Sequence, residues 1–246
     1  MQSFTYHSPT EIIFGRGAEN AVAEKLRAFG TSRVLILYGG GSVERSGLLS
    51  RIEKNLTSAG LAFLVMGGVR PNPRVSFVRE AIREGLAADV NFILGVGGGS
   101  VIDSAKAVAH GMANPTTDIW DIWTRKVEIT KTLPFGSVVT IPAAGSETSD
   151  SAVLTNEDTG RKVGLNSPLN RAVFAFMNPE LAFTLPRTQI AAGGADIMMH
   201  TMERYFTSVK ETNLFTDRVS EQLILTVMES IRRLLVSRKD YDAMSE

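Results

Sequence analysis

Two glycine-rich runs are the first candidates for chemistry in this sequence. They consist of Gly97, Gly98, Gly99 and Ser100, and of Gly39, Gly40, Gly41 and Ser42. Where glycine follows a strand and precedes a helix, backbone NH groups can approach a phosphate without a side chain in the way, and the helix dipole adds attraction. Asp103 and Lys106 follow the first run on its predicted helix, so we expect this run to bind a pyrophosphate. The alternative is a tight turn that needs glycine only for its backbone angles.

The run at residues 39–42 bears on which dinucleotide would bind. Sites for NAD often place an acidic side chain at the end of this strand, against the ribose 2′-hydroxyl. Glycines and a serine stand there instead, and they leave room and donors for a 2′-phosphate. The sequence therefore favours NADP(H) over NAD(H), although neither run has the common G-x-G-x-x-G spacing.

A third candidate is the pair Asp196 and His200, which are four residues apart and therefore lie on one face of a predicted helix. A carboxylate and an imidazole in this arrangement can share a divalent ion. A solvated or hydrogen-bonded pair without a metal is the alternative. Glu203 lies on roughly the same face and is expected to be a surface charge, and His7 and His110 are expected to be surface or packing residues.

Alternating strand and helix patterns must position these groups. Strand-like runs at 11–15, 34–38, 61–66 and 91–96 each precede a helical pattern, and a further strand is expected at 138–141. Consecutive βα units predict a parallel sheet with right-handed crossovers and helices on both faces. Two strand-like segments around residues 158–160 predict a hairpin.

The pattern changes to helical after Pro179 and Pro186, with long amphipathic helices at 190–206 and 214–235. The sequence thus predicts an α/β protein with a Rossmann-like parallel-sheet domain at residues 1–185, which binds the dinucleotide. An all-helical metal-binding domain is expected to start at residue 186 and to be incomplete at residue 246.

The composition excludes several other functions. Lysine plus arginine and aspartate plus glutamate both number 26, so no net charge attracts nucleic acid or an anionic membrane. The lack of cysteine excludes thiolate metal sites and fits a reducing compartment, so a cytoplasmic location is expected. Residues 1–10 have neither the basic flank nor the apolar run typical of a signal peptide, and no apolar run in the sequence is expected to cross a membrane.

These motifs together resemble the iron-containing, or group III, alcohol dehydrogenases, and in particular their NADPH-dependent butanol dehydrogenase and aldehyde reductase branch. The most specific pieces are Gly-Gly-Gly-Ser-x-x-Asp-x-x-Lys at 97–106, Ile-Pro-Ala-Ala-Gly-Ser-Glu at 141–147, and Gly-Ala-Asp at 194–196 with His200. The resemblance runs the whole length of the chain. It implies hydride transfer between NADP(H) and a small primary alcohol or aldehyde, and a homodimer is expected.

The resemblance also implies roles for single residues. Residues 97–100 bind the pyrophosphate, Gly40 and Ser42 surround the 2′-phosphate, and Asp103, Thr140, Ser149 and Lys162 complete the cofactor site, the last three near the riboses. Asp196 and His200 are the first two ligands of a divalent metal, Fe²⁺ or Zn²⁺, which polarises the substrate oxygen, and they are therefore the expected catalytic residues.

Two departures from the family pattern matter. Ala144 stands where many relatives have threonine. The family's other two metal ligands are histidines on later helices, whereas no histidine follows His200 here. We therefore expect a truncated or partly represented enzyme that binds cofactor better than it turns over. The alternatives are a glycerol-dehydrogenase-like or dehydroquinate-synthase-like relative, a nucleotide-binding module without catalysis, and an unrelated α/β protein.

Overall fold

A computed structural model of the chain describes residues 3, 5–208 and 213–246. Its main feature is a six-stranded sheet in which all neighbours are parallel, with the order β1-β8-β5-β4-β2-β3. In that order the strands are β1 (Glu11–Phe14), β8 (Phe174–Met177), β5 (Phe135–Val139), β4 (Phe92–Gly97), β2 (Arg33–Tyr38) and β3 (Ala62–Met66). The predicted α/β class with a parallel sheet is confirmed.

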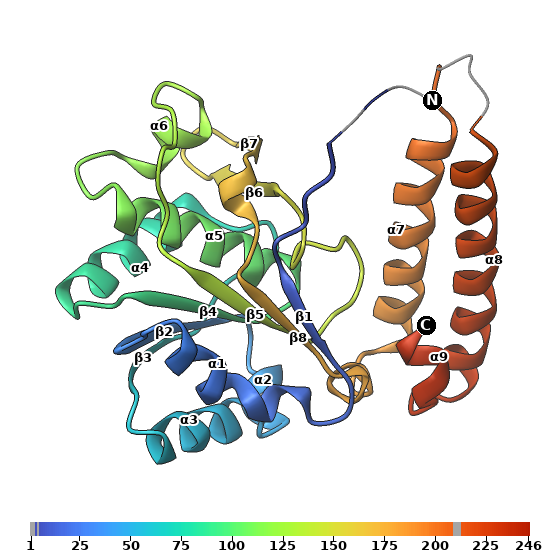
Figure 1. The fold of residues 1–246 in the computed structure, drawn as a ribbon, viewed down its shortest axis with the longest axis horizontal. Coiled ribbons are helices and arrows are strands. Elements are labelled where there is room, and N and C mark those ends of the chain that lie inside the picture. The colour runs from blue at the N-terminus through green and yellow to red at the C-terminus, as the bar shows by residue number, and fades with distance from the viewer. Residues whose placement is uncertain (1–2, 4, 209–212) are drawn as a thin grey trace. The chain divides into compact units, whose positions relative to one another are not determined.

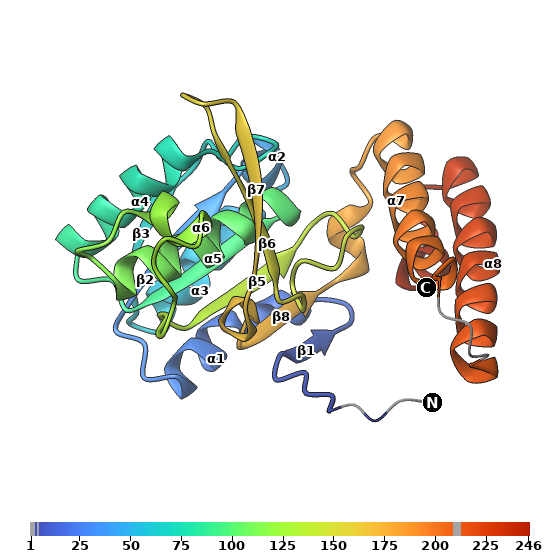
Figure 2. The same ribbon diagram turned by 90° about the horizontal axis from the view of Figure 1, so that it is seen from above.

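Helices cover both faces of this sheet, with α1 and α3 on one face and α4, α5 and α6 on the other (Figures 1 and 2). The elements between the strands are the 3-10 helix η1 (Ala18–Ala21) and the helices α1 (Val22–Ala28), α2 (Ser42–Arg45), α3 (Leu48–Ser58), α4 (Val75–Ala87), α5 (Gly99–Ala113) and α6 (Ile119–Trp123). Residues 34–37 of the central strand β2 and all of β4 lack charged side chains and are buried, as expected for strands that are covered on both faces.

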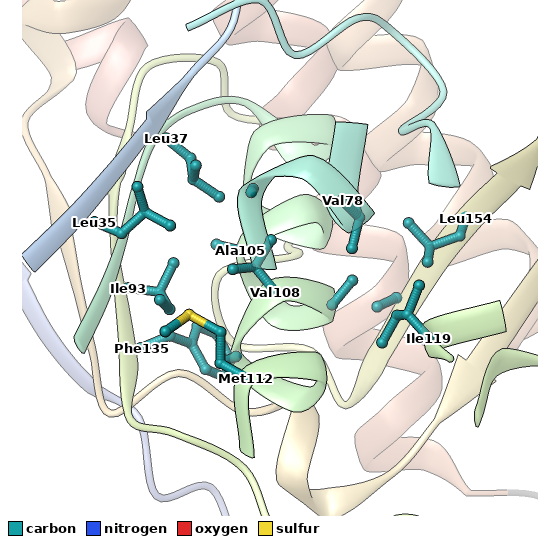
Figure 3. Packing of buried hydrophobic residues seen from close by; sticks show 14 of the residues in the cluster. Leu35, Leu37, Val78, Ile93, Ala105, Val108, Met112, Ile119, Phe135 and Leu154 are labelled. Atoms are coloured by element: carbon teal, nitrogen blue, oxygen red, sulfur yellow. The ribbon is translucent and has the colours of Figure 1, made fainter. Parts of the chain in front are cut away.

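The core lies between the sheet and α4, α5 and α6. Figure 3 shows Leu35, Ile93 and Phe135 of the sheet against Ala105 and Val108 of α5. Helix α5 is buried along most of its length, since the hairpin of β6 (Ser151–Asn156) and β7 (Arg161–Asn166) also contacts this side of the molecule. The hairpin was predicted around residues 158–160, and its two strands are antiparallel.

Several elements of the fold differ from the sequence-based expectation. Strand β8, which has four residues, and helix α6, which has five, were not predicted from the sequence. The helical pattern expected after the strand at 34–38 is divided into α2 and α3, because Gly47 has a left-handed φ of 72°. Strand β5 ends at Val139 rather than at Ile141.

The contacts divide the chain into two compact units. One comprises the sheet, its helices and the hairpin, at Ser8–Thr140 and Gly145–Asn178. The other contains Ile141–Ala144 and Pro179–Glu246, and therefore includes the 3-10 helix η3 (Pro179–Ala182) and the helices α7 (Arg187–Tyr205), α8 (Leu214–Val236) and α9 (Tyr241–Ser245). The 3-10 helix η2 (Pro168–Asn170) belongs to the first unit.

Within the helical unit, α7 and α8 pack closely side by side. Gly194 makes this possible, because a Cβ at this position would collide with Ile231 of α8. The Arg187 guanidinium also donates to the Leu235 carbonyl, at 2.8 Å. No helix in the described parts of the chain has both the length and the apolar character needed to cross a membrane.

Candidate functional site

The two glycine-rich runs lie next to each other, at the carboxyl edge of the sheet. Strands β2 and β4 are neighbours in register, with Tyr38 paired to Val96. The chain leaves β2 toward β3 on one side and leaves β4 toward β5 on the other. Such a reversal of strand order opens a crevice outside the carboxyl ends of the strands, and this is where ligands bind in open α/β sheets.

The glycines around β4 have two different roles. Gly95 and Gly97 let α5 lie on the strand, since an added Cβ would be 3.3 Å from Ala105 Cβ and 2.6 Å from Val101 Cγ2, respectively. At Gly99, by contrast, a Cβ would have ordinary contact with Ser146 at 3.9 Å, and the backbone angle is not left-handed. Among the residues that the structure describes, none therefore requires glycine at position 99.

The start of α5 offers unpaired backbone donors. Its N-cap is Gly98, which has no side chain to cap the helix, and the first backbone bond runs from Val101 N to Gly98 O at 2.9 Å. The amides of Gly99 and Ser100 precede that bond and have no acceptor within the helix. Together with the helix dipole they suit an anionic group.

In the run at 39–42, glycine again occupies a position where packing does not require it. A Cβ at Gly40 would have no heavy atom within 4 Å, and its φ is not left-handed. At Gly39, a Cβ would be 3.4 Å from the Val69 carbonyl oxygen and 3.6 Å from Val101 in the first turn of α5, so this run lies close to the start of that helix. Ser42 is exposed at the start of α2.

Two charged side chains flank the second run. Glu44 Oε2 is 3.4 Å and Arg45 Nη1 is 2.8 Å from the position of a Cβ on Gly41. Tyr38 donates its hydroxyl to Glu44 Oε1 at 2.5 Å, and this hydrogen bond raises the pKa of Tyr38. The sequence has no acidic residue at the end of the strand, but α2 brings one to the turn, a residue that sequence reasoning missed.

Asp103 points into the protein from α5. Its Oδ1 accepts from Ser146 Oγ at 2.5 Å, and its Oδ2 accepts from the Val153 amide at 2.9 Å. Burial raises the pKa of Asp103, and Lys106 and Ser146 oppose that shift. Asp103 was predicted to bind cofactor, whereas its hydrogen bonds in the structure hold the segment at 146–153.

Lys106 is fully buried one turn further along α5. Its ammonium donates to the carbonyl oxygens of Ser149 and Ser151, at 3.0 and 2.7 Å. Burial lowers the pKa of Lys106 to about 8, although the nearby Asp103 carboxylate favours the charged form. The sequence places Lys106 near the run at 97–100. In the structure its hydrogen bonds hold the same segment that Asp103 contacts, residues 146–153.

A second set of polar contacts, partly buried and also missed by sequence reasoning, holds this segment. Arg171 donates to Thr148 O at 2.6 Å and to the Asp150 carboxylate at 3.3 Å, and Asn170 donates to Asp150 O at 2.8 Å. His110 contacts Asn170 Oδ1 through Nε2 at 2.7 Å, and burial lowers the pKa of His110 to about 4. His110 is therefore a neutral packing residue at neutral pH.

The other three predicted cofactor residues lie in different surroundings. Thr140 follows β5 and donates its amide to Gly97 O at 3.1 Å, so it is next to the first run. Ser149 Oγ accepts from the Ser151 amide at 2.9 Å within the held segment. Lys162, on β7, is exposed and donates to Asn72 Oδ1 at 2.9 Å, in the loop between β3 and α4.

Asp196 and His200 lie on one face of α7, with Oδ1 and Nε2 3.9 Å apart. Their side chains are 46% and 43% exposed, so both can reach a ligand, and Glu203 Oε2 is 3.9 Å from His200 Nδ1. An oxygen and an imidazole nitrogen suit Fe²⁺ or Zn²⁺. Among the described residues, however, no three histidine or carboxylate side chains gather to hold an ion, so this pair supplies only part of a metal site.

Comparisons with known proteins agree on one family. The family model described as iron-containing alcohol dehydrogenase matches residues 9–179. A probable NADH-dependent butanol dehydrogenase 1 of Bacillus subtilis is 42% identical over 98% of this chain, and the NADPH-dependent aldehyde reductase YqhD of Escherichia coli is 37% identical over 98%. In both comparisons the chain covers 62% of the relative's length.

Solved structures show the same relationship. The structure of NADH-dependent butanol dehydrogenase A from Thermotoga maritima has a TM-score of 0.96 and 39% sequence identity. It covers all of this chain, which in turn covers 61% of that protein. Both units of the chain therefore have counterparts in a protein of known structure.

We expect Lys106→Met to change the pH dependence of stability. Lys106 titrates near pH 8 in the folded protein and near 10.5 when unfolded, so between these values the unfolded chain binds more protons. The free energy of unfolding of the wild type therefore rises with pH across this window, by about 3 kcal/mol for this one group. The cost of burying the charge is complete below pH 8 and is gone above about 10.5.

Urea denaturation of the wild type and the variant, from pH 7 to 10.5, measures this effect. The difference in unfolding free energy, wild type minus Lys106→Met, should increase with pH. Lys162→Met, which removes an exposed lysine, is the matched control. Identical pH slopes for the wild type and Lys106→Met would contradict the assignment.

Proposed function

This chain belongs to the iron-containing alcohol dehydrogenase family, and on that premise we propose that it binds a nicotinamide dinucleotide at the carboxyl edge of β2 and β4. The main observation behind the proposal is that glycine occupies positions 40 and 99, although a larger side chain would fit there. Neither a contact nor a backbone angle within the protein requires glycine there. A ligand that lies directly against the backbone accounts for both.

The cofactor's pyrophosphate would lie on the amides of residues 98–100, at the N-terminus of α5. The adenosine ribose would then face residues 39–42, where the exposed Ser42 and the open space at Gly40 leave room for the 2′-phosphate of NADP(H). The similar proteins include NADH- and NADPH-dependent enzymes by name, so the proposal covers both forms of the cofactor.

The proposed reaction is hydride transfer between this cofactor and a small primary alcohol or aldehyde. The names of the relatives support this substrate class, since they are butanol dehydrogenases and an aldehyde reductase. Asp196 and His200 would supply two ligands of a divalent ion, which when bound polarises the substrate oxygen. A catalytic metal site usually has at least three protein ligands, so this pair holds an ion weakly by itself.

A second candidate function is a nucleotide-binding module without catalysis. It is favoured by the lack, among the described residues, of a third side chain close enough to Asp196 and His200 to complete the metal site. The two functions share the nucleotide site and differ in whether hydride transfer follows binding.

Gly99→Ala should weaken cofactor binding and leave the fold intact. The new methyl group fits the protein, since its nearest neighbour would be 3.9 Å away, but it would project toward the phosphate. We expect the Kd for NADPH, from fluorescence titration, to rise at least about tenfold. Gly164→Ala, on β7 with open space around the new Cβ, is the matched control and should bind like the wild type.

Unchanged binding by Gly99→Ala at wild-type stability would refute the placement of the pyrophosphate. Turnover separates the two candidate functions. Loss of NADPH absorbance on addition of butanal and Fe²⁺ supports the oxidoreductase. If the chain binds the cofactor tightly but butanal causes no loss of NADPH absorbance, the result supports a nucleotide-binding module for this chain.

Asp196→Asn and His200→Gln should each reduce metal affinity. Calorimetric titration of the wild-type chain with Zn²⁺ should show weak binding, and each variant should lower the affinity at least about tenfold because a direct ligand is lost. Glu229→Gln, at an exposed carboxylate of α8, is the control for a general loss of negative charge. Equal Zn²⁺ affinity in the wild type and both variants would exclude the pair as ligands.

A further inference from the structure

We propose that Glu44 and Arg45 together control how the site distinguishes NADH from NADPH, and that their opposed charges make this chain accept both. Glu44 would disfavour the 2′-phosphate, and Arg45 would favour it. This inference rests on the proposed function, because it takes the run at 39–42 to face the adenosine ribose.

Glu44 is held in place before any ligand binds. The ring of Tyr38 lies over Gly67, where a Cβ would collide with it, and the Tyr38 hydroxyl donates to Glu44 Oε1 at 2.5 Å. The hydrogen bond raises the pKa of Tyr38, so the phenol remains a donor at neutral pH. The second oxygen of Glu44, Oε2, is 3.4 Å from the place that a Cβ on Gly41 would occupy.

A fixed carboxylate at this place acts differently on the two cofactors. It can accept a hydrogen bond from the ribose 2′-hydroxyl of NADH, which is the usual role of an acidic residue in such sites. It repels the 2′-phosphate of NADPH. Tyr38 thus acts as a positioning residue, because it fixes the carboxylate without needing to touch the cofactor.

Arg45 supplies the opposite preference from the same helix. Its Nη1 is 2.8 Å and its Cζ is 3.8 Å from the position of a Cβ on Gly41, so the guanidinium lies across the turn. A guanidinium presents several donors in one plane and binds phosphate oxygens well. At an exposed edge, removal of either charge should change affinity for the 2′-phosphate by about five- to tenfold.

Fluorescence titration of the 246-residue chain with NADH and with NADPH tests this inference. The two Kd values of the wild type should agree within about tenfold. Glu44→Gln should shift the ratio of affinities toward NADPH by about fivefold or more, and Arg45→Gln should shift it toward NADH by a similar factor. Tyr38→Phe should shift it in the direction of Glu44→Gln, but by less.

Glu24→Gln, at an exposed carboxylate of α1, removes the same charge elsewhere and should leave the ratio unchanged. Circular dichroism shows whether each variant is folded. If both cofactors bind but the ratio stays the same in Glu44→Gln and Arg45→Gln, this inference is wrong and the proposed function stands. If the folded wild type binds neither cofactor, the proposed function is wrong, and the inference fails with it.

Discussion

The arrangement of the candidate site depends on how closely the backbone of helix α5 approaches the end of strand β4. Helix α5 must lie directly on this strand, and Gly95 and Gly97 permit it because any Cβ there would press on Ala105 or Val101. The same approach brings the first turn of α5 beside the run that follows β2, since a Cβ on Gly39 would be 3.6 Å from Val101. Packing thus places two glycine-lined turns at the point where strand order reverses, and Gly40 and Gly99 leave the backbone there open to a ligand.

A buried pair of opposite charges keeps the neighbouring segment in place. Asp103 and Lys106 direct their polar atoms at residues 146–153, and Arg171 and Asn170 also donate hydrogen bonds to this segment. Burial of either charge alone would be costly, and the raised pKa of Asp103 and the lowered pKa of Lys106 reflect that cost. The hydrogen bonds offset it, so the segment that carries Ser149 is fixed relative to α5.

Features that depend on local periodicity could be predicted from the sequence, whereas the burial and direction of single side chains could not. The parallel sheet, the hairpin and the long helices follow from repeating patterns, and the i, i+4 spacing alone places Asp196 and His200 on one face of α7. Spacing also places Asp103 and Lys106 near the phosphate turn, but it cannot show that both side chains turn inward. Glu44 escaped notice because the turn geometry, and not the order of residues along the strand, brings its carboxylate to Gly41.

Hydrogen exchange with and without NADPH tests the central claim most directly, because it reports on backbone amides and needs no substitution. If the cofactor's phosphates lie on the two glycine-rich runs, exchange should slow in peptides that contain residues 39–42 and 97–100, and the hairpin tip at 157–160 should be unaffected. Exchange that is unchanged in both runs at saturating NADPH, with protection confined to other segments, would contradict the account.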